Sequence, residues 1–283
     1  MFERLKVNRP REAATYYTIL IIDSPKEFSE ILRTANELVN MTRRPLETGR
    51  ASLLKYGLIA EVLFSEDTNE FGRESFLPVH PQVIWEDIKE DLQDVVSEQT
   101  FQLMGSRLQQ YVDTYDENYK SYGIKLRRHG NVTLRYSGRW VLYNIMHHCM
   151  KNPEELCLQI GGNRLFEDPY IRYFRKFLDL SPNVRLIIDE DVDVDLAQTL
   201  VDQYKDRLDI RCFHEATAGT MRNYVFGKQM AINGIKILQE TKHEPSYVGT
   251  AYVEPEEIEV LSCKFNDMWD LAKPALECKK KAS

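Results

Sequence analysis

The stretch Ala231-Ile232-Asn233-Gly234-Ile235-Lys236-Ile237-Leu238 places an Asn-Gly pair between two short apolar runs. Asn and Gly readily adopt the left-handed backbone conformation that a two-residue turn requires. The sequence therefore predicts a β-hairpin with Asn233-Gly234 as its turn. A terminal helix is predicted after this hairpin.

Upstream of the hairpin, strand-like and helix-like segments alternate. Strands are predicted over residues 131–136, 156–160, 184–188 and 208–213, and helices over residues 140–150, 170–178 and 194–204. This order is typical of a sheet covered by helices. We therefore expect an α/β domain over residues 123–283.

Two further features follow the predicted hairpin: the segment Gly249-Thr250-Ala251, and the pattern Phe265-x-x-x-Trp269 in the closing helix. With these features in this order, residues 131–275 resemble the phospholipase-D-like domain that is the effector domain of TrmB-type archaeal transcription regulators. The resemblance implies a domain that senses an effector and controls an N-terminal DNA-binding domain.

Active members of the phospholipase-D-like superfamily carry the motif His-x-Lys-x4-Asp, in which the His attacks phosphorus and the Lys binds phosphate oxygens. Here that spacing falls on Phe226, Lys228 and Asn233. Phe cannot act as a nucleophile, so the resemblance implies a protein that is not an enzyme, with Lys228 and Asn233 as candidate ligand-binding residues. Lys228 can equally be a solvent-exposed charge of the hairpin. A phosphodiesterase or nuclease ranks last, because it needs another nucleophile such as His214 or His243.

The N-terminal part predicts a different architecture. A β-branched and aromatic run predicts a strand over residues 16–22, and apolar residues at steps of three and four predict a helix over residues 28–39. Met41-Thr42-Arg43-Arg44-Pro45 predicts a break, and a second helix over residues 46–56 is expected to end at Gly57. A hairpin over residues 58–79 follows.

Helix, turn, helix and hairpin over residues 35–79 follow the order of a winged helix, a fold that binds DNA through its second helix. The cationic candidates for DNA contact are Arg43, Arg44, Arg50 and Lys55. The turn of the expected wing carries carboxylates that DNA phosphates would repel, namely Glu66, Asp67, Glu70 and Glu74. A winged helix kept for protein contact is therefore the alternative.

Between these two parts, apolar positions recur over residues 83–119 and predict one long amphipathic helix, with a break near Gly105. An isolated helix of this kind needs a partner to bury its stripe, so we expect a homodimer. The predicted domains are residues 1–82, 83–122 and 123–283. The basic stretch from Lys125 to Arg139 either binds an anion or pairs with the acidic residues 86–94.

Composition narrows the classes of protein. The chain has 283 residues with 43% hydrophobic and 29% charged residues, which is ordinary for a globular protein, and no apolar run long enough to span a membrane. Its five cysteines lack the spacing of a zinc site, so no metal or cofactor is expected. We expect a cytoplasmic protein.

The leading hypothesis is a TrmB-like regulator whose DNA binding is controlled by an effector at the C-terminal domain. The alternative is a non-catalytic interaction subunit of a protein complex.

Overall fold

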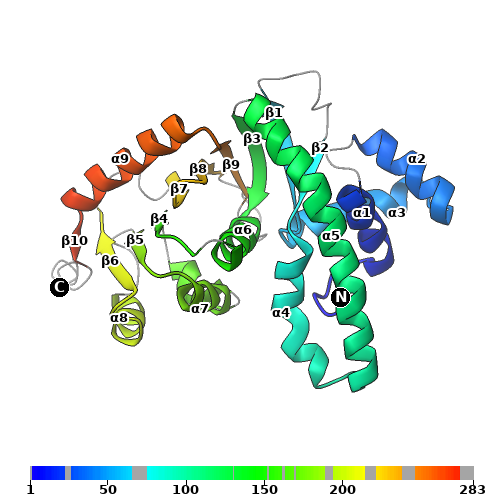
Figure 1. Ribbon diagram of the computed structural model, residues 1–283, viewed down its shortest axis with the longest axis horizontal. Coiled ribbons are helices and arrows are strands. Elements are labelled where there is room, and N and C mark those ends of the chain that lie inside the picture. The colour runs from blue at the N-terminus through cyan, green and yellow to red at the C-terminus, as the bar shows by residue number, and fades with distance from the viewer. Residues whose placement is uncertain are drawn as a thin grey trace. The chain divides into compact units, whose positions relative to one another are not determined.

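The computed structural model describes residues 2–22, 27–65, 75–129, 131–151, 153–160, 163–168, 170–188, 194–213, 221–237 and 246–274. The fold is mixed α+β, as predicted (Figure 1). The chain divides into two compact units, Met1–His147 and His148–Ser283. The domain boundaries predicted after residues 82 and 122 stay a prediction.

The first unit begins with helices α1 (Pro10–Ile22), α2 (Phe28–Val39) and α3 (Arg43–Lys55). The predicted strand over residues 16–22 is wrong, because these residues belong to α1. Ala13, Tyr16, Tyr17 and Leu20 are buried at steps of three and four, which is the period of a helix. The β-branched and aromatic composition reflects how deeply α1 is buried, and tertiary packing overrides strand propensity.

Helix α2 is confirmed, but α3 begins two residues earlier than Pro45. Proline is tolerated in a first helical turn because the backbone N–H groups there have no partner within the helix. Arg43 and Arg44 therefore belong to α3 and not to the turn before it. The helix stops at Gly57 as predicted, and the φ of +68° at this residue is one that glycine adopts without strain.

The predicted hairpin is confirmed as strands β1 (Ile59–Ser65) and β2 (Ser75–Pro78), which pair antiparallel. The turn with its four carboxylates lies outside the described residues. Strand β3 (Val132–Ser137) pairs antiparallel with the other edge of β1. The strand order in this unit is therefore β3-β1-β2.

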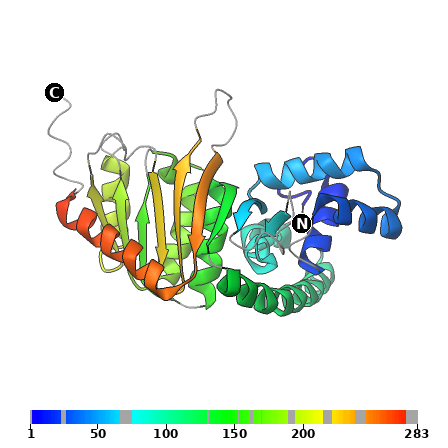
Figure 2. The same cartoon turned by 90° about the horizontal axis from the view of Figure 1, so that it is seen from above.

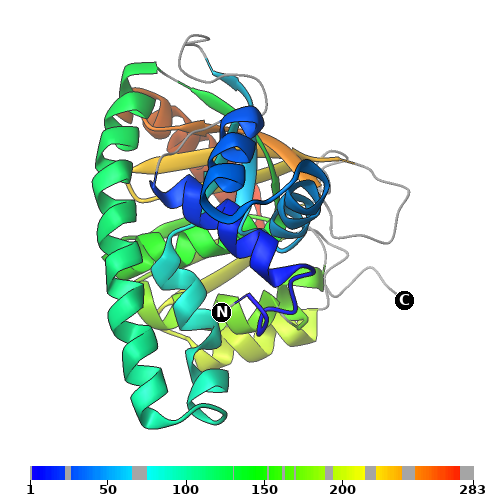
Figure 3. The ribbon, with the colours of Figure 1, turned by 90° about the vertical axis from the view of Figure 1, so that its right-hand side faces the viewer.

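The predicted single long helix is wrong. It is two helices, α4 (Pro81–Gln93) and α5 (Glu98–His129), and α5 continues through Gly105 (Figure 3). The Ser97 hydroxyl oxygen accepts from the Thr100 backbone N–H at 3.3 Å and so caps the new helix. Part of the apolar stripe packs within the same chain, where α4 residues Trp85, Ile88 and Leu92 meet α5 residues Phe101, Met104 and Leu108.

Helix α6 (Gly138–Lys151) contains the division between the two units. In the second unit the strand order is β10-β6-β5-β4-β7-β8-β9. Strands β4, β5 and β6 are parallel, and the other neighbours are antiparallel. The strands are β4 (Leu156–Gln159), β5 (Val184–Ile188), β6 (Leu208–Cys212), β7 (Met221–Phe226), β8 (Met230–Lys236), β9 (Ser246–Tyr252) and β10 (Lys273–Pro274).

Helices cover both faces of this sheet. Helices α7 (Tyr170–Leu180) and α8 (Val194–Gln203) lie on one face, and α9 (Pro255–Leu271) crosses the strands on the other (Figures 1 and 2). A short 3-10 helix, η1 (Asn163–Phe166), precedes α7. The predicted alternation of strands and helices is confirmed.

The predicted hairpin exists, but its turn is elsewhere. Phe226 pairs with Met230, so the turn is Gly227-Lys228-Gln229, while Asn233 and Gly234 lie inside β8. Gly227 has a φ of +52°, the left-handed conformation that the sequence assigned to Asn233-Gly234. Asn233 lies opposite Asn223 of β7, so two polar residues share this level of the sheet.

Candidate nucleic-acid interface

The outward side of α3 presents Arg44, Thr48, Ala51 and Lys55, all of which are exposed. Their spacing places them on one side of a helix, since residues three, four and seven apart share a side. In the described part of the chain, neither Arg44 nor Lys55 forms an ion pair, and Glu47, three residues after Arg44, pairs with Arg43. We call Arg44, Thr48, Ala51 and Lys55 the cationic stripe. Because Thr48 and Ala51 between the two cations are small, the backbone of α3 can approach a polyanion closely.

Arg43 and Arg50, which were also predicted as DNA contacts, lie on a different side of α3. The Arg43 Nε donates to the Glu47 carboxylate at 2.8 Å, although 70% of the Arg43 side chain is exposed. The Arg50 guanidinium lies over two rings, at 4.6 Å from the centroid of Phe28 and 5.4 Å from that of Phe76. Arg50 therefore joins α3 to α2 and β2 by cation–π contact, which is a structural role.

The opposite side of α3 fixes the helix against α1. Leu46 and Leu53 are fully buried, and Gly49 meets the backbone of α1. A Cβ at Gly49 would lie 2.8 Å from both the Ala13 backbone nitrogen and the Glu12 carbonyl carbon. This close approach of two helices holds the cationic stripe in place.

Of the basic stretch from Lys125 to Arg139, the structure describes the side chains of Arg135 and Arg139. Side chains of Lys125, Arg127 and Arg128 lie outside the described part, although the backbone there is α5. Arg135 on β3 donates to Glu61 on β1 at 3.1 Å. The sequence left two alternatives open for this stretch, anion binding and pairing with the acidic residues 86–94. The pair of Arg135 and Glu61 is neither of these.

In the second unit, the structure does not bring the two predicted ligand-binding residues together. Lys228 is exposed in the turn, where its backbone N–H donates to the Glu154 carboxylate at 3.1 Å. Asn233 lies further along β8, opposite Asn223. Phe226, at the presumed nucleophile position, is fully buried and packs 5.7 Å from the ring of His148. Burial lowers the pKa of His148 below its ordinary value.

The observed turn shifts the motif alignment. When the Asp position of His-x-Lys-x4-Asp is aligned with Lys228 in the turn, the His position falls on Met221 and the Lys position falls on Asn223. The nucleophile position is then Met and the phosphate-binding position is Asn. The candidate substitutes His214 and His243 lie outside the described residues.

A polar row crosses the sheet at this level. Gln159, Asn223, Asn233 and Thr250 are in register on the neighbouring strands β4, β7, β8 and β9. The Asn223 amide donates to the Gln159 side-chain oxygen, and both residues are buried. Within the described part of the chain, the Asn223 Oδ1 is buried without a hydrogen-bond partner. Sequence reasoning missed Gln159 and Asn223, because only the strand register reveals that they share a row with Asn233.

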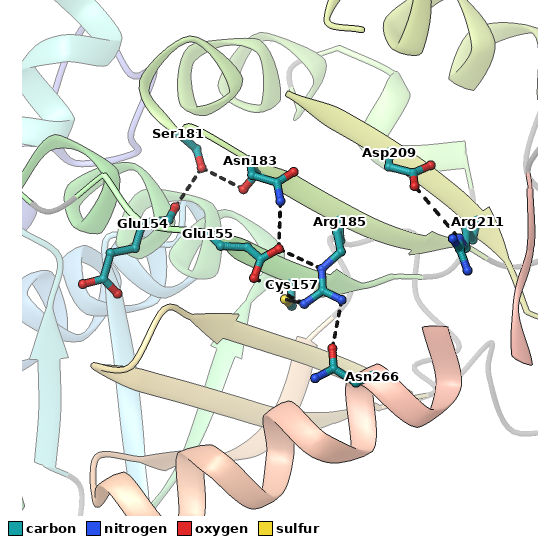
Figure 4. Close-up of polar contacts among 9 residues, drawn as sticks. All are labelled: Glu154, Glu155, Cys157, Ser181, Asn183, Arg185, Asp209, Arg211 and Asn266. Carbon is teal, nitrogen blue, oxygen red and sulfur yellow. Dashed lines mark hydrogen bonds and ion pairs between the residues drawn. The ribbon is translucent and has the colours of Figure 1, made fainter. Parts of the chain in front are cut away.

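The Phe265-x-x-x-Trp269 pattern has a structural explanation. Arg185 on β5 donates to Glu155 at 2.9 Å and to the Asn266 side chain at 2.8 Å, which ties α9 to the sheet (Figure 4). The Arg185 guanidinium also lies 5.3 Å from the Phe265 ring centroid, and the Arg211 guanidinium lies 4.5 Å from a ring centroid of Trp269. These contacts dock the closing helix.

In the described ranges, no group of three or more metal-ligating side chains gathers. Among the helices of the same ranges, none combines the length and the apolarity that a membrane span needs.

Comparison with known proteins gives distant likenesses only. No family model and no curated protein matches the sequence. One similar solved structure is TrmBL2, an archaeal chromatin protein said to show a novel mode of DNA binding, with 12% identity, 96% of each chain covered and a TM-score of 0.37. Another is NucT from Helicobacter pylori, with 10% identity, 51% of this chain and 99% of that chain covered, and a TM-score of 0.39.

A third similar structure is Nuc from Salmonella typhimurium, a phospholipase D family member. It is 11% identical, with 46% of this chain and 88% of that chain covered and a TM-score of 0.36. Likenesses this distant carry no argument about activity. The function therefore has to be inferred from the residues of this chain.

Proposed function

We propose that this protein is a DNA-binding regulator that contacts duplex DNA through the outward side of α3. The observation that supports the proposal is the stripe of Arg44, Thr48, Ala51 and Lys55, which is exposed and has a cation at each end. Duplex DNA is a polyanion, and cations that neutralise its phosphates supply most of its sequence-independent affinity.

The length of the stripe suits a groove of DNA. A rise of about 1.5 Å per residue places Arg44 and Lys55 about 16 Å apart along α3. The major groove is about 12 Å wide, so the two cations reach phosphates on its opposite edges while Thr48 and Ala51 face the bases. Arg43 contributes less because Glu47 partly neutralises it.

The test is a gel shift against DNA from upstream of the protein's own gene, repeated over a series of salt concentrations. We expect Arg44→Ala with Lys55→Ala to weaken binding and to lower the slope of log K against log salt by about 2, since each phosphate contact contributes about 0.9. Lys205→Ala with Lys264→Ala is the control, because it removes the same charge from exposed positions of the second unit. Equal loss in both double variants would contradict the proposal.

We propose that the second unit is a sensor and not a catalyst. The support is the absence of His from the motif in either alignment, with Phe226 or Met221 at the nucleophile position. The buried Asn223 Oδ1 marks the polar row as the place where an effector would donate a hydrogen bond. Purified protein is expected to leave bis-p-nitrophenyl phosphate intact. Cleavage that disappears in Lys228→Ala would sink this part of the proposal.

A non-catalytic interaction subunit remains the second candidate, and one feature favours it. Exposed carboxylates on α4 and α5 include Glu90, Asp91, Glu98 and Glu117. A negatively charged surface repels DNA and attracts a basic protein. If the wild-type protein binds no DNA at low salt, this second candidate replaces the first.

A further inference from the structure

The segment before α1 is folded, with apolar residues inward and charged residues outward. Phe2 and Val7 are buried, and the Val7 N–H donates to the Phe2 carbonyl at 3.1 Å. The Phe2 ring meets the Tyr17 ring of α1 edge-on at 5.4 Å, and Leu5 packs against the cluster between α4 and α5. The outward residues Arg4 and Lys6 are therefore held on an ordered backbone.

The same segment is tied to the end of α3. The Tyr56 hydroxyl donates to the Lys6 carbonyl at 2.6 Å. Lys55 Nζ lies 5.9 Å from the centroid of the Tyr56 ring, and the Arg139 guanidinium lies 5.6 Å from it. One tyrosine thus gathers the backbone of Lys6 and the cations of Lys55 and Arg139 at one end of the cationic stripe.

Contacts with α3 place this segment relative to the cationic stripe. Each residue of a helix advances about 100° around its axis, so Gly49 and Tyr56 lie together on the side of α3 that packs against α1, more than a quarter-turn from Arg44 and Lys55. Gly49 meets Glu12 and Ala13 of α1, and Tyr56 meets Lys6. Residues 6–13 therefore follow the side of α3 that faces α1, and Lys6 lies near the end of the stripe at Lys55.

The cations of the segment are available to a partner. Arg4, Lys6 and Arg11 are exposed, and none of them has an ion-pair partner in the described part of the chain. Arg9 is less available, because it lies 3.8 Å from the Glu12 carboxylate. Lys6 and Arg9 have φ values of 54° and 55°, a left-handed conformation that is strained for a residue with a side chain. Such strain persists where surrounding contacts fix the backbone. Here the fixed backbone leaves the side chains of Lys6 and Arg9 exposed to solvent.

We infer that residues 4–11 form a second contact for the phosphate backbone of duplex DNA, beside α3, through Arg4, Lys6 and Arg11. The inference rests on the proposed DNA binding and assigns residues that lie outside the helix-turn-helix elements. A preformed contact of this kind loses little conformational entropy on binding, in contrast to a flexible basic tail.

The experiment is fluorescence anisotropy of the full chain with a labelled DNA duplex over a salt series. Lys6→Ala with Arg11→Ala is expected to lower the salt slope by about 2. Lys6→Arg with Arg11→Lys keeps both charges and is expected to restore the wild-type slope. The matched control is Lys205→Ala with Lys264→Ala, for which the slope stays at the wild-type value.

The outcomes separate this inference from the proposal on which it rests. Loss of slope in Arg44→Ala with Lys55→Ala, together with a wild-type slope in Lys6→Ala with Arg11→Ala, would overturn the second contact and leave the first. No binding by the wild-type protein would overturn both. A slope that falls in the alanine pair and not in the charge-conserving pair supports the inference.

Discussion

At the scale of the residue, arginines of one helix differ in what surrounds them. Arg44 extends from the outward side of α3, whereas Arg50 lies over the rings of Phe28 and Phe76. In sequence both are arginines of a short basic helix. Only the fold separates a cation that is free to contact DNA from one that holds helices together.

Gly49 is the residue on which the placement of α3 depends. Gly49→Ala would put a Cβ 2.8 Å from the backbone of α1, so we expect the free energy of unfolding to fall by about 1 to 3 kcal/mol. Gly105→Ala is the matched control, because nothing lies within 4 Å of its Cβ, and helix propensity should make it stabilising by about 0.5 to 1 kcal/mol. Urea unfolding measures both. A Gly49→Ala protein as stable as Gly105→Ala would contradict the close helix crossing.

Thiol reactivity tests the packing of the second unit. Burial raises the pKa of Cys157 to about 11, and the nearby Arg185 only partly offsets it, whereas Cys263 on α9 is exposed. Because the thiolate is the reactive form, iodoacetamide at pH 8 should label Cys263 well before Cys157. Mass spectrometry of the digested native protein measures this order. Equal labelling rates would show that α9 does not cover Cys157.

At the scale of the element, two predictions failed for the same physical reason. The stripe over residues 83–119 predicted one helix, and Asn233-Gly234 predicted a turn, because a local pattern carries no information about the segments packed against it. In the structure the chain turns at Ser97 between two helices, and Asn233 lies inside β8 opposite Asn223. The true turn at Gly227 carries a weaker local signal, since a glycine followed by Lys-Gln is common outside turns.

Because α4 and α5 pack against each other, a substitution between them should lower the stability of the protein. Ile88 is 2% exposed inside the cluster of α4 and α5, so Ile88→Asp should lower the free energy of unfolding by roughly 3 kcal/mol or more. Leu103 on α5 is 52% exposed, and Leu103→Asp should leave stability within about 0.5 kcal/mol. Chemical denaturation measures both values. Equal effects would show that the two helices do not pack as described.

The homodimer stays a prediction, and α5 offers a surface for it. Among the described side chains of α5, the apolar residues Leu103 and Tyr111 are 52% and 41% exposed and available to a partner. We expect a dimeric mass by light scattering for the wild type and a smaller mass for Leu103→Asp. A monomeric wild type at micromolar concentration would remove the dimer from the account.

At the scale of the whole molecule, the sequence predicted the class of fold and the order of most elements. Alternating segments after residue 131 gave the sheet and its helices, because strands and helices there have clear periods and clear ends. The candidate sites were predicted less well. Arg44 and Lys55 remain together, Arg50 became structural, and Lys228 was separated from Asn233, since each outcome depends on contacts between residues far apart in the chain.

The central claim is that α3 contacts DNA, and lysine footprinting tests it most directly. The protein is acetylated with and without a DNA duplex, and the extent of modification at each lysine is measured by mass spectrometry. We predict that DNA protects Lys55, and Lys6 beside it, whereas the exposed Lys205 and Lys264 react equally in both samples. Protection of Lys205 and Lys264 with full reaction at Lys55 would contradict the claim.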